Sequence, residues 1–217
     1  MLLHADLTQR AVVHTKTSLW VPSPEAGVER LPLDRHGGEL ARATSLVRYA
    51  PGSRFAPHTH GRGEEFLVLA GEFRDEHGSY PTGTYVRNPW HSHHAPFSPT
   101  VTTLFAKLRQ IPADDDVKVC LVSVVDTCVL LPGQSERVVV LHSSSSEWVA
   151  LVRWAKGHQA KAHAHPDGEE LFVLDGDLED EHGTYRAGTW LRQPTNSSHR
   201  PFSVTGCLYF VKRGPRG

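Results

Sequence analysis

The sequence lacks the features that direct a chain to a membrane or to nucleic acid. Its 217 residues contain no apolar run near the ~18 residues that a membrane helix needs. It has no long run of lysine or arginine, and the formal net charge is −1 at pH 7. The N-terminal residues show no basic region followed by an apolar stretch. We therefore expect a cytoplasmic protein whose partners include neither a membrane nor a nucleic acid.

Cysteine is scarce, and the three copies are isolated. Cys120, Cys128 and Cys207 form no Cys-x2-Cys pair, so the sequence offers neither a disulfide framework nor a thiolate zinc site. We expect them to be reduced and packed. No Ser-His-Asp arrangement, phosphate-binding glycine loop or dinucleotide fingerprint occurs in a strand–helix context. Any catalysis is therefore expected to run through a metal ion.

Histidine, by contrast, is abundant, with 15 copies. His58 and His60 are two residues apart, and Glu64 follows four residues later. Alternate side chains of an extended strand share a face, so both imidazoles should point to the same side. Two imidazoles and a carboxylate suit a divalent transition metal, and His94 is the candidate for the remaining ligand.

The same arrangement occurs a second time. The second set is His163, His165, Glu169 and His199. In both sets the first and last histidines are 36 residues apart. Residues 52–98 and 157–203 align without a gap, with about half of the positions identical. A period of about a hundred residues is too long for a solenoid. We interpret the chain as two similar domains that hold up to two metal ions.

Short β-like runs bounded by Gly, Pro, Asn or Asp recur along both halves, and no helix longer than a turn or two is expected. The runs are residues 28–33, 43–49, 65–69, 83–87, 101–108, 117–125, 138–141, 149–154 and 207–212. We predict an all-β fold of two tandem jelly-roll barrels, with residues 1–25 as an arm. The polar stretch 111–116 breaks the pattern, so we expect domains at 1–114 and 115–217, with 117–125 as the first strand of the second.

These motifs resemble those of the cupin superfamily. Its first motif, G-x5-H-x-H-x3-E-x6-G, is matched from Gly52 to Gly71 and again from Gly157 to Gly176. Its second motif, G-x5-P-x-G-x2-H, is matched by Gly83, Pro89 and His94, and by Gly188, Pro194 and His199. The inner glycine of the second motif is replaced by His91 in one copy and by Asn196 in the other. This departure concerns a local turn and leaves the histidine ligand in place.

Within the cupins, the blocks Gly-Glu-Glu and Asp-Glu-His-Gly-x-Tyr resemble the ChrR type. That type includes part of a zinc anti-sigma factor and metal dioxygenases that cleave acetophenone-like or diketone substrates. The anti-sigma factor grips its partner through a helical module with a His-x3-Cys-x2-Cys site. The first 40 residues here contain no cysteine, so a sigma factor is not expected as a partner.

The identity of the ions stays open at this point. Glu65 and Glu170 adjoin the motif glutamates and should face away from the sites, which favours Glu64 and Glu169 as the ligands. Three imidazoles and one carboxylate can close a tetrahedral zinc site. They can also occupy part of an octahedron around iron, manganese or nickel and leave room for a substrate.

Two hypotheses follow. The first is an oxygenase that uses a metal such as non-haem iron and acts on a small dicarbonyl or hydroxyketone. The second is a non-catalytic zinc-binding module with a sensing or regulatory role. Both hypotheses imply a small-molecule ligand. The sequence decides neither between them nor whether the chain forms a homo-oligomer, and it identifies no catalytic residue beyond the metal ligands.

Overall fold

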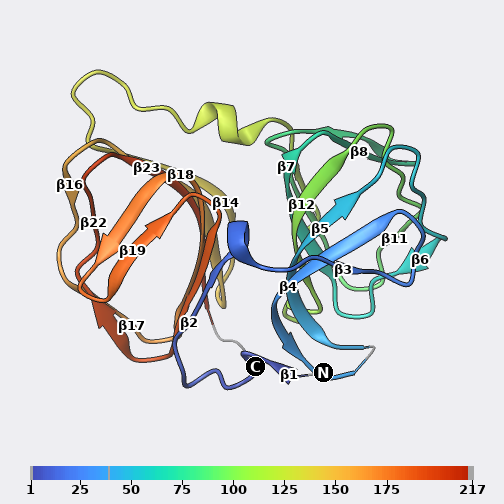
Figure 1. Ribbon diagram of the computed structural model, residues 1–217, viewed down its shortest axis with the longest axis horizontal. Coiled ribbons are helices and arrows are strands. Elements are labelled where there is room, and N and C mark those ends of the chain that lie inside the picture. Colours follow the sequence, from blue (N-terminus) through green and yellow to red (C-terminus); the bar gives the residue numbers. More distant parts are fainter. Residues whose placement is uncertain (1, 39, 215–217) are drawn as a thin grey trace. The chain divides into compact units, whose positions relative to one another are not determined.

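The structure is a computed structural model that describes residues 2–38 and 40–214. Strands dominate it, and the helices among the described residues are two short 3-10 turns, η1 (Thr15–Thr17) and η2 (Val124–Thr127). The strands form two β-barrels (Figure 1). The all-β, two-barrel fold predicted from the sequence is confirmed. No helix of the described residues is long and apolar enough to cross a membrane.

The first barrel is built on an eight-stranded antiparallel sheet in the order β1-β4-β5-β12-β7-β10-β13, with β3 paired to β4. These strands are β1 (Leu2–Leu3), β3 (Val21–Pro22), β4 (Val28–His36), β5 (Arg42–Tyr49), β7 (Glu64–Ala70), β10 (Tyr85–Asn88), β12 (Thr102–Leu108) and β13 (Val119–Leu121). Two short ladders complete the barrel. They are β6 (His58–Thr59) with β11 (His93–His94), and β8 (Glu72–Asp75) with β9 (Gly78–Pro81).

The second barrel repeats this plan in a nine-stranded sheet with the main order β14-β15-β23-β18-β20-β2. Its strands are β2 (Ala11–His14), β14 (Glu136–Ser143), β15 (Trp148–Trp154), β16 (His158–Gln159), β18 (Glu169–Asp180), β19 (Gly183–Arg186), β20 (Thr189–Gln193), β22 (Phe202–Ser203) and β23 (Cys207–Arg213). A separate ladder joins β17 (His163–His165) to β21 (Ser197–His199). It corresponds to the β6–β11 ladder of the first barrel.

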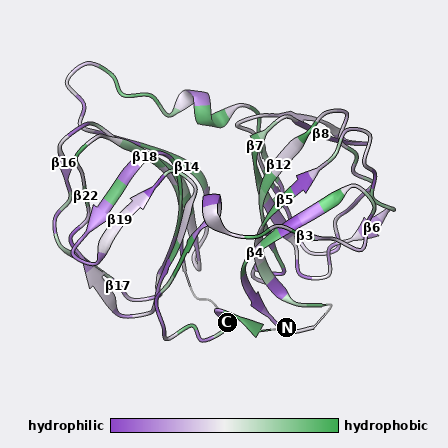
Figure 2. Ribbon diagram, in the orientation of Figure 1, coloured by the Kyte–Doolittle hydropathy of each residue, from purple (hydrophilic) through white to green (hydrophobic). Residues whose placement is uncertain are grey.

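Each barrel has an apolar core. The strands carry both hydrophobic and hydrophilic residues (Figure 2), as expected where one face of a strand is buried. In the first barrel the core includes Val47, Tyr49, Phe66 and Phe73, and the tilted rings of Tyr49 and Phe73 are 5.2 Å apart between centroids. The core of the second barrel includes Trp154 and Tyr209 in an edge-to-face pair.

The outer strand next to β10 or β20 comes from the opposite half of the sequence. In the first barrel β13 pairs with β10, with Leu121 opposite Tyr85. In the second, β2 pairs with β20, with Val13 opposite Trp190, the repeat counterpart of Tyr85. The two halves have therefore exchanged their leading strands.

This exchange corrects two details of the sequence interpretation. The run 117–125 contributes its strand to the first barrel, and the N-terminal arm contributes a strand to the second. The compact units are thus Leu19–Asp126 with the first residues of the chain, and Asp6–Ser18 with Thr127 onward. They differ from a single division after residue 114 because strand pairing crosses the repeat boundary.

Removal of residues 1–18 should weaken the second barrel more than the first, which loses only the two-residue edge strand β1 next to β4. The shortened chain leaves the edge of β20 unpaired next to the fully buried Trp190. The loss of Ala11, Val12 and Val13 should cost roughly 2–3 kcal/mol of apolar burial. Hydrogen exchange measured by mass spectrometry should accelerate in β20 and stay slow in β10, whose partner β13 remains. Equal protection of β20 in the full and shortened chains would contradict the exchange.

Candidate metal centres

Three histidines and a glutamate of the first barrel converge. His58 on β6 is directly opposite His94 on β11, and His60 lies just after β6. The centroids of the three imidazole rings are 4.8–5.0 Å apart. Glu64, the first residue of β7, directs its Oε2 atom to within 3.5 Å of His60 Nε2 and 3.6 Å of His94 Nε2. All four residues predicted for this site are thus brought together.

The converging atoms have the character of metal ligands. His60 Nε2 and Glu64 Oε2 are buried, and neither has a hydrogen-bond partner within residues 2–38 and 40–214. Buried polar atoms without partners are costly, so such a pair needs a bound group. Two ligand atoms each about 2.1 Å from one ion lie about 3.0–3.4 Å apart, close to the distances seen here. The residues therefore fit a divalent transition-metal ion.

The outer ring nitrogens are also engaged, which orients the inner ones. His58 Nδ1 lies 3.0 Å from the Ala56 carbonyl oxygen, and His94 Nδ1 lies 3.0 Å from Asp75 Oδ2. When Nδ1 carries the proton and donates it to these oxygens, Nε2 is left with a lone pair that faces the centre. Two of the three imidazoles are in this way held as ligands before any ion binds.

Local charge and burial set the protonation of these histidines. Burial is the main cause that lowers the pKa of His60, so its ring stays neutral at pH 7. Burial also acts to lower the pKa of His94, but the Asp75 hydrogen bond and the Glu64 charge outweigh it and raise that pKa. The carboxylates thus compensate the positive charge of a proton at His94. A bound metal ion would replace this proton as the positive charge.

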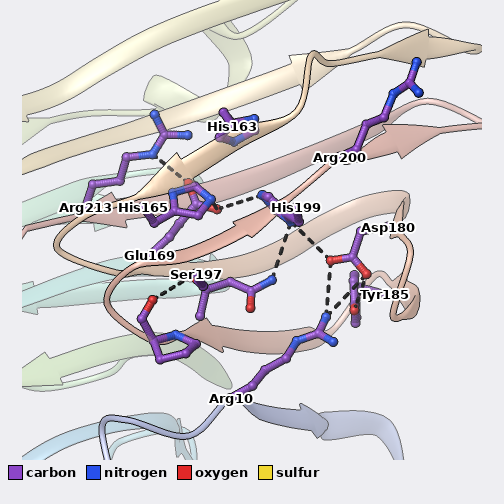
Figure 3. A network of polar contacts seen from close by, with 12 residues as sticks. Arg10, His163, His165, Glu169, Asp180, Tyr185, Ser197, His199, Arg200 and Arg213 are labelled. Carbon is purple, nitrogen blue, oxygen red and sulfur yellow. Dashed lines mark hydrogen bonds and ion pairs between the residues drawn. The ribbon is translucent and has the colours of Figure 1, made fainter.

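The second barrel contains the same constellation (Figure 3). His163 and His199 are paired across the β17–β21 ladder, and the three ring centroids are 4.8–4.9 Å apart. Glu169 Oε1 lies 3.5 Å from His165 Nε2 and 3.8 Å from His199 Nε2. Both Nε2 atoms are buried without a hydrogen-bond partner in the described part of the chain. Burial lowers the pKa of His165 to about 4.

A carboxylate contacts the outer ring nitrogen of His199, as Asp75 contacts that of His94. Asp180 Oδ2 lies 3.2 Å from His199 Nδ1, and Asp180 Oδ1 accepts a hydrogen bond of 2.7 Å from the Tyr185 hydroxyl. Arg10 adds an ion pair of 3.2 Å to Asp180 (Figure 3). Arg10 precedes β2, so the exchanged N-terminal segment also supports the orientation of a candidate ligand.

Neighbouring polar residues turn away from the two centres. Glu65 accepts a hydrogen bond from the Tyr85 hydroxyl, and Glu170 accepts one from Trp190 Nε1. This orientation agrees with the predicted alternation.

At the positions of the missing motif glycine, His91 and Asn196 have positive φ angles of 64° and 59°. The turn is kept, because both residues adopt the left-handed backbone that glycine would supply.

The two centres differ in the space around them. A cavity of about 390 Å³ opens onto the first one, and Ala43 and Leu108 line it beside the four candidate ligands. The repeat counterparts of these two residues are Trp148 and Arg213, which stack with the guanidinium 5.2 Å from the ring centre. Arg213 Nε donates a 2.6 Å hydrogen bond to Glu169 Oε2. Larger side chains thus stand at these two positions in the second barrel, and one of them engages its glutamate.

The sequence interpretation missed Asp75, Asp180, Arg10 and Arg213. A signal for the two aspartates was present, because both begin the repeated block Asp-Glu-His-Gly-x-Tyr, and the tyrosine of that block bonds the aspartate in each barrel. For Arg213 the signal was a difference between the copies, with leucine at the matching position. Nothing in the sequence links Arg10 to Asp180 without the exchanged strand.

Replacement of His60 by alanine should remove about one equivalent of metal and leave the second centre filled. The two ligand sets belong to different barrels, so each should load by itself. Metal content of the full chain, measured by plasma mass spectrometry, gives the result. Thr59→Ala is the matched control, because Thr59 is exposed and lies between two candidate ligands. Loss of both ions in His60→Ala would show that the barrels do not load independently.

Replacement of Asp75 by asparagine should weaken the first metal without removing a ligand. The variant loses the charge behind His94 Nδ1, and such changes typically lower metal affinity about 10- to 100-fold. Competition with a chelator measures the affinity. Asp180→Asn should affect the second centre in the same way, so each variant controls for the other. Unchanged affinity in both variants would exclude an orienting role for these carboxylates.

Comparisons with known proteins agree with this architecture. A crystal structure of a "putative dioxygenase" from Nostoc punctiforme superposes with a TM-score of 0.77 at 16% identity, covering 96% of this chain and 84% of that one. A variant of oxalate decarboxylase from Bacillus subtilis gives a TM-score of 0.65 at 12% identity, with coverages of 95% and 78%. Another structure of that decarboxylase is described by its Mn(II) centres. At these identities the likeness establishes the fold.

A "Cupin 2 conserved barrel domain protein" from Leptotrichia buccalis also superposes, with a TM-score of 0.62 at 13% identity over 89% of this chain and 92% of that one. Among curated proteins, none matches this chain. The model of the ChrR cupin-like domain matches residues 8–112 and again residues 119–216, which together make up most of the sequence. The chain, with its two His/Glu constellations on tandem barrels, belongs to the ChrR cupin-like family.

Proposed function

We propose that the protein is a metal-dependent oxygenase that acts on a small dicarbonyl or hydroxyketone at the first barrel. The observation that carries this proposal is the cavity, which ends at His58, His60, Glu64 and His94. These four residues would hold one ion, iron or a similar divalent metal, which supplies Lewis acidity and oxygen activation. The resemblance to the dioxygenase branch of the family supports the reaction class.

The overall reaction balances without a further cofactor. One carbon–carbon bond next to a carbonyl group breaks, and the two oxygen atoms of O₂ form the new carbon–oxygen bonds of the two products. O₂ is the oxidant and the substrate is the reductant. No nicotinamide or flavin is needed, which agrees with a sequence that has no dinucleotide fingerprint.

Residues around the cavity contribute an apolar wall and one hydrogen-bond donor. Phe55, Phe73 and Leu104 give the cavity an apolar wall beside the candidate ligands. Tyr49 also lines the cavity, and burial together with the Glu64 charge raises its pKa well above the usual value. Its phenol therefore keeps its proton at neutral pH, and it can donate a hydrogen bond to a carbonyl oxygen.

A second candidate function concerns the other barrel. Glu169 is almost fully buried and accepts a hydrogen bond from Arg213. Trp148, next to Arg213, is much larger than Ala43, its counterpart in the first barrel. Such a centre favours an ion whose coordination is completed by protein ligands, for example zinc, with a structural or sensing role. The two hypotheses from the sequence thus apply to different barrels. A cytoplasmic location and a homo-oligomer stay predictions.

Oxygen uptake by the iron-loaded full chain tests the oxygenase proposal. With a panel of diketones, His60→Ala should reduce uptake to the rate of the metal-free protein, because it removes a ligand of the first centre. His165→Ala should retain most of the uptake while losing about one equivalent of metal. Uptake that depends on His165 and not on His60 would assign the reaction to the second barrel and contradict the proposal. No uptake with any compound, in protein that holds its metal, would favour the sensing role for both.

A further inference from the structure

The cavity of the first barrel carries an excess of positive charge that metal binding alone does not explain. Three arginines line it, Arg30, Arg35 and Arg109, against two carboxylates, those of Glu25 and Glu64. Glu64 is a candidate metal ligand, so a divalent ion would increase the positive charge further. A cavity with this balance attracts an anion.

Strand register directs two of these arginines to the cavity. Arg30 on β4 is opposite Val47 on β5, and Arg35 is opposite Ala43. Directly opposite residues of an antiparallel pair share a face, and both Val47 and Ala43 line the cavity. A β-bulge between Pro32 and Asp34 shifts the register, which keeps Arg35 on the same face as Arg30.

Arg109 is the arginine nearest to the candidate ligands. Its Nη1 atom lies 3.0 Å from the point where a Cβ atom on Gly61 would stand, directly after His60. Its φ angle is 59°, a left-handed backbone that residues other than glycine seldom adopt. Neither Arg109 nor Arg30 forms an ion pair with a carboxylate in residues 2–38 and 40–214, whereas Arg35 donates to the Gly38 carbonyl oxygen. Two guanidinium groups are therefore available to a ligand.

The second barrel has lost this charge. By strand register and the repeat alignment, the positions of Arg30, Arg35 and Arg109 are taken by Val138, Ser143 and Gly214. Two arginines near the second centre are already paired, Arg213 with Glu169 and Arg10 with Asp180. The basic lining is thus a property of the open barrel and does not follow from the shared fold.

We propose that the first barrel binds a carboxylate-bearing carbonyl compound, with Arg109, the arginine beside the candidate ligands, as the anchor for the carboxylate and the apolar wall of the cavity around the rest of the molecule. This deepens the proposed function and rests on it, because the carbonyl group would face the metal centre. The ligand is small, since the cavity volume of about 390 Å³ is at the lower end of typical ligand sites. The second barrel does not bind such a compound.

A matched pair of probes tests the proposal in the iron-loaded full chain without oxygen. Benzoylformate and 1-phenylpropane-1,2-dione share a phenyl ring and two adjacent carbonyl groups, but only the first carries a negative charge. Calorimetric titration should show tighter binding of benzoylformate by about tenfold or more, the effect of a hydrogen bond to a charged group. Arg109→Gln should remove most of this preference and leave the affinity for the dione unchanged.

Two further variants complete the experiment. Arg54→Gln is the control, because Arg54 belongs to the same barrel but is exposed and stacks on Phe97 outside the cavity. The double variant Ala43→Trp/Leu108→Arg copies the filling of the second barrel and should abolish benzoylformate binding with the metal retained. Metal content is measured for every variant.

The proposal is overturned if benzoylformate does not bind, if the dione binds equally well, or if Arg109→Gln behaves like Arg54→Gln. Its failure is distinct from that of the oxygenase proposal. Binding of benzoylformate that requires Arg109, without oxygen uptake on any tested compound, refutes the oxygenase alone. Uptake with the neutral dione, together with benzoylformate binding that Arg109→Gln does not weaken, refutes the anion site alone.

Discussion

The structure depends on the convergence of imidazole nitrogens and one carboxylate oxygen at a place from which water is largely excluded. Buried polar atoms without partners destabilise a fold by about 1–3 kcal/mol each. His60 Nε2, Glu64 Oε2, His165 Nε2 and His199 Nε2 are all atoms of this kind within the described residues. The imidazole rings of His58 and His163 are oriented around them by backbone carbonyls, and those of His94 and His199 by Asp75 and Asp180. A bound divalent ion would satisfy them together, which makes metal binding a condition of full stability.

Duplication has kept this arrangement and changed its surroundings. Both barrels retain the histidines, the glutamate and the supporting aspartate, so the capacity to hold an ion is common to them. Around this common set, Ala43 and Leu108 leave room in one barrel, while Trp148 and Arg213 occupy it in the other. One copy could thus specialise in binding a substrate, and the other in stability. The exchange of β2 and β13 makes each barrel require residues from both halves of the sequence.

Much of the fold and the convergence of the candidate ligands could be predicted because the signals are local or repeated. The spacing of His58 and His60 follows from strand alternation, and the second copy reproduces every interval. The exchanged strands could not be predicted, since Val119–Leu121 has the same pattern whichever β-edge it joins. Arg10 and Arg109 were missed for a related reason. Their roles come from contacts across the barrel, to Asp180 and beside Gly61, which no sequence interval encodes.

A crystal structure of the metal-loaded full chain, with anomalous scattering recorded at the absorption edge of the bound metal, tests the account most directly. We predict one ion in each barrel, about 2.0–2.2 Å from three histidine nitrogens and one glutamate oxygen. The ion of the first barrel should carry water on the side of the cavity, and that of the second should have no open position. Ions held by other residues, or no anomalous peak between the two histidine sets and their glutamates, would contradict the account.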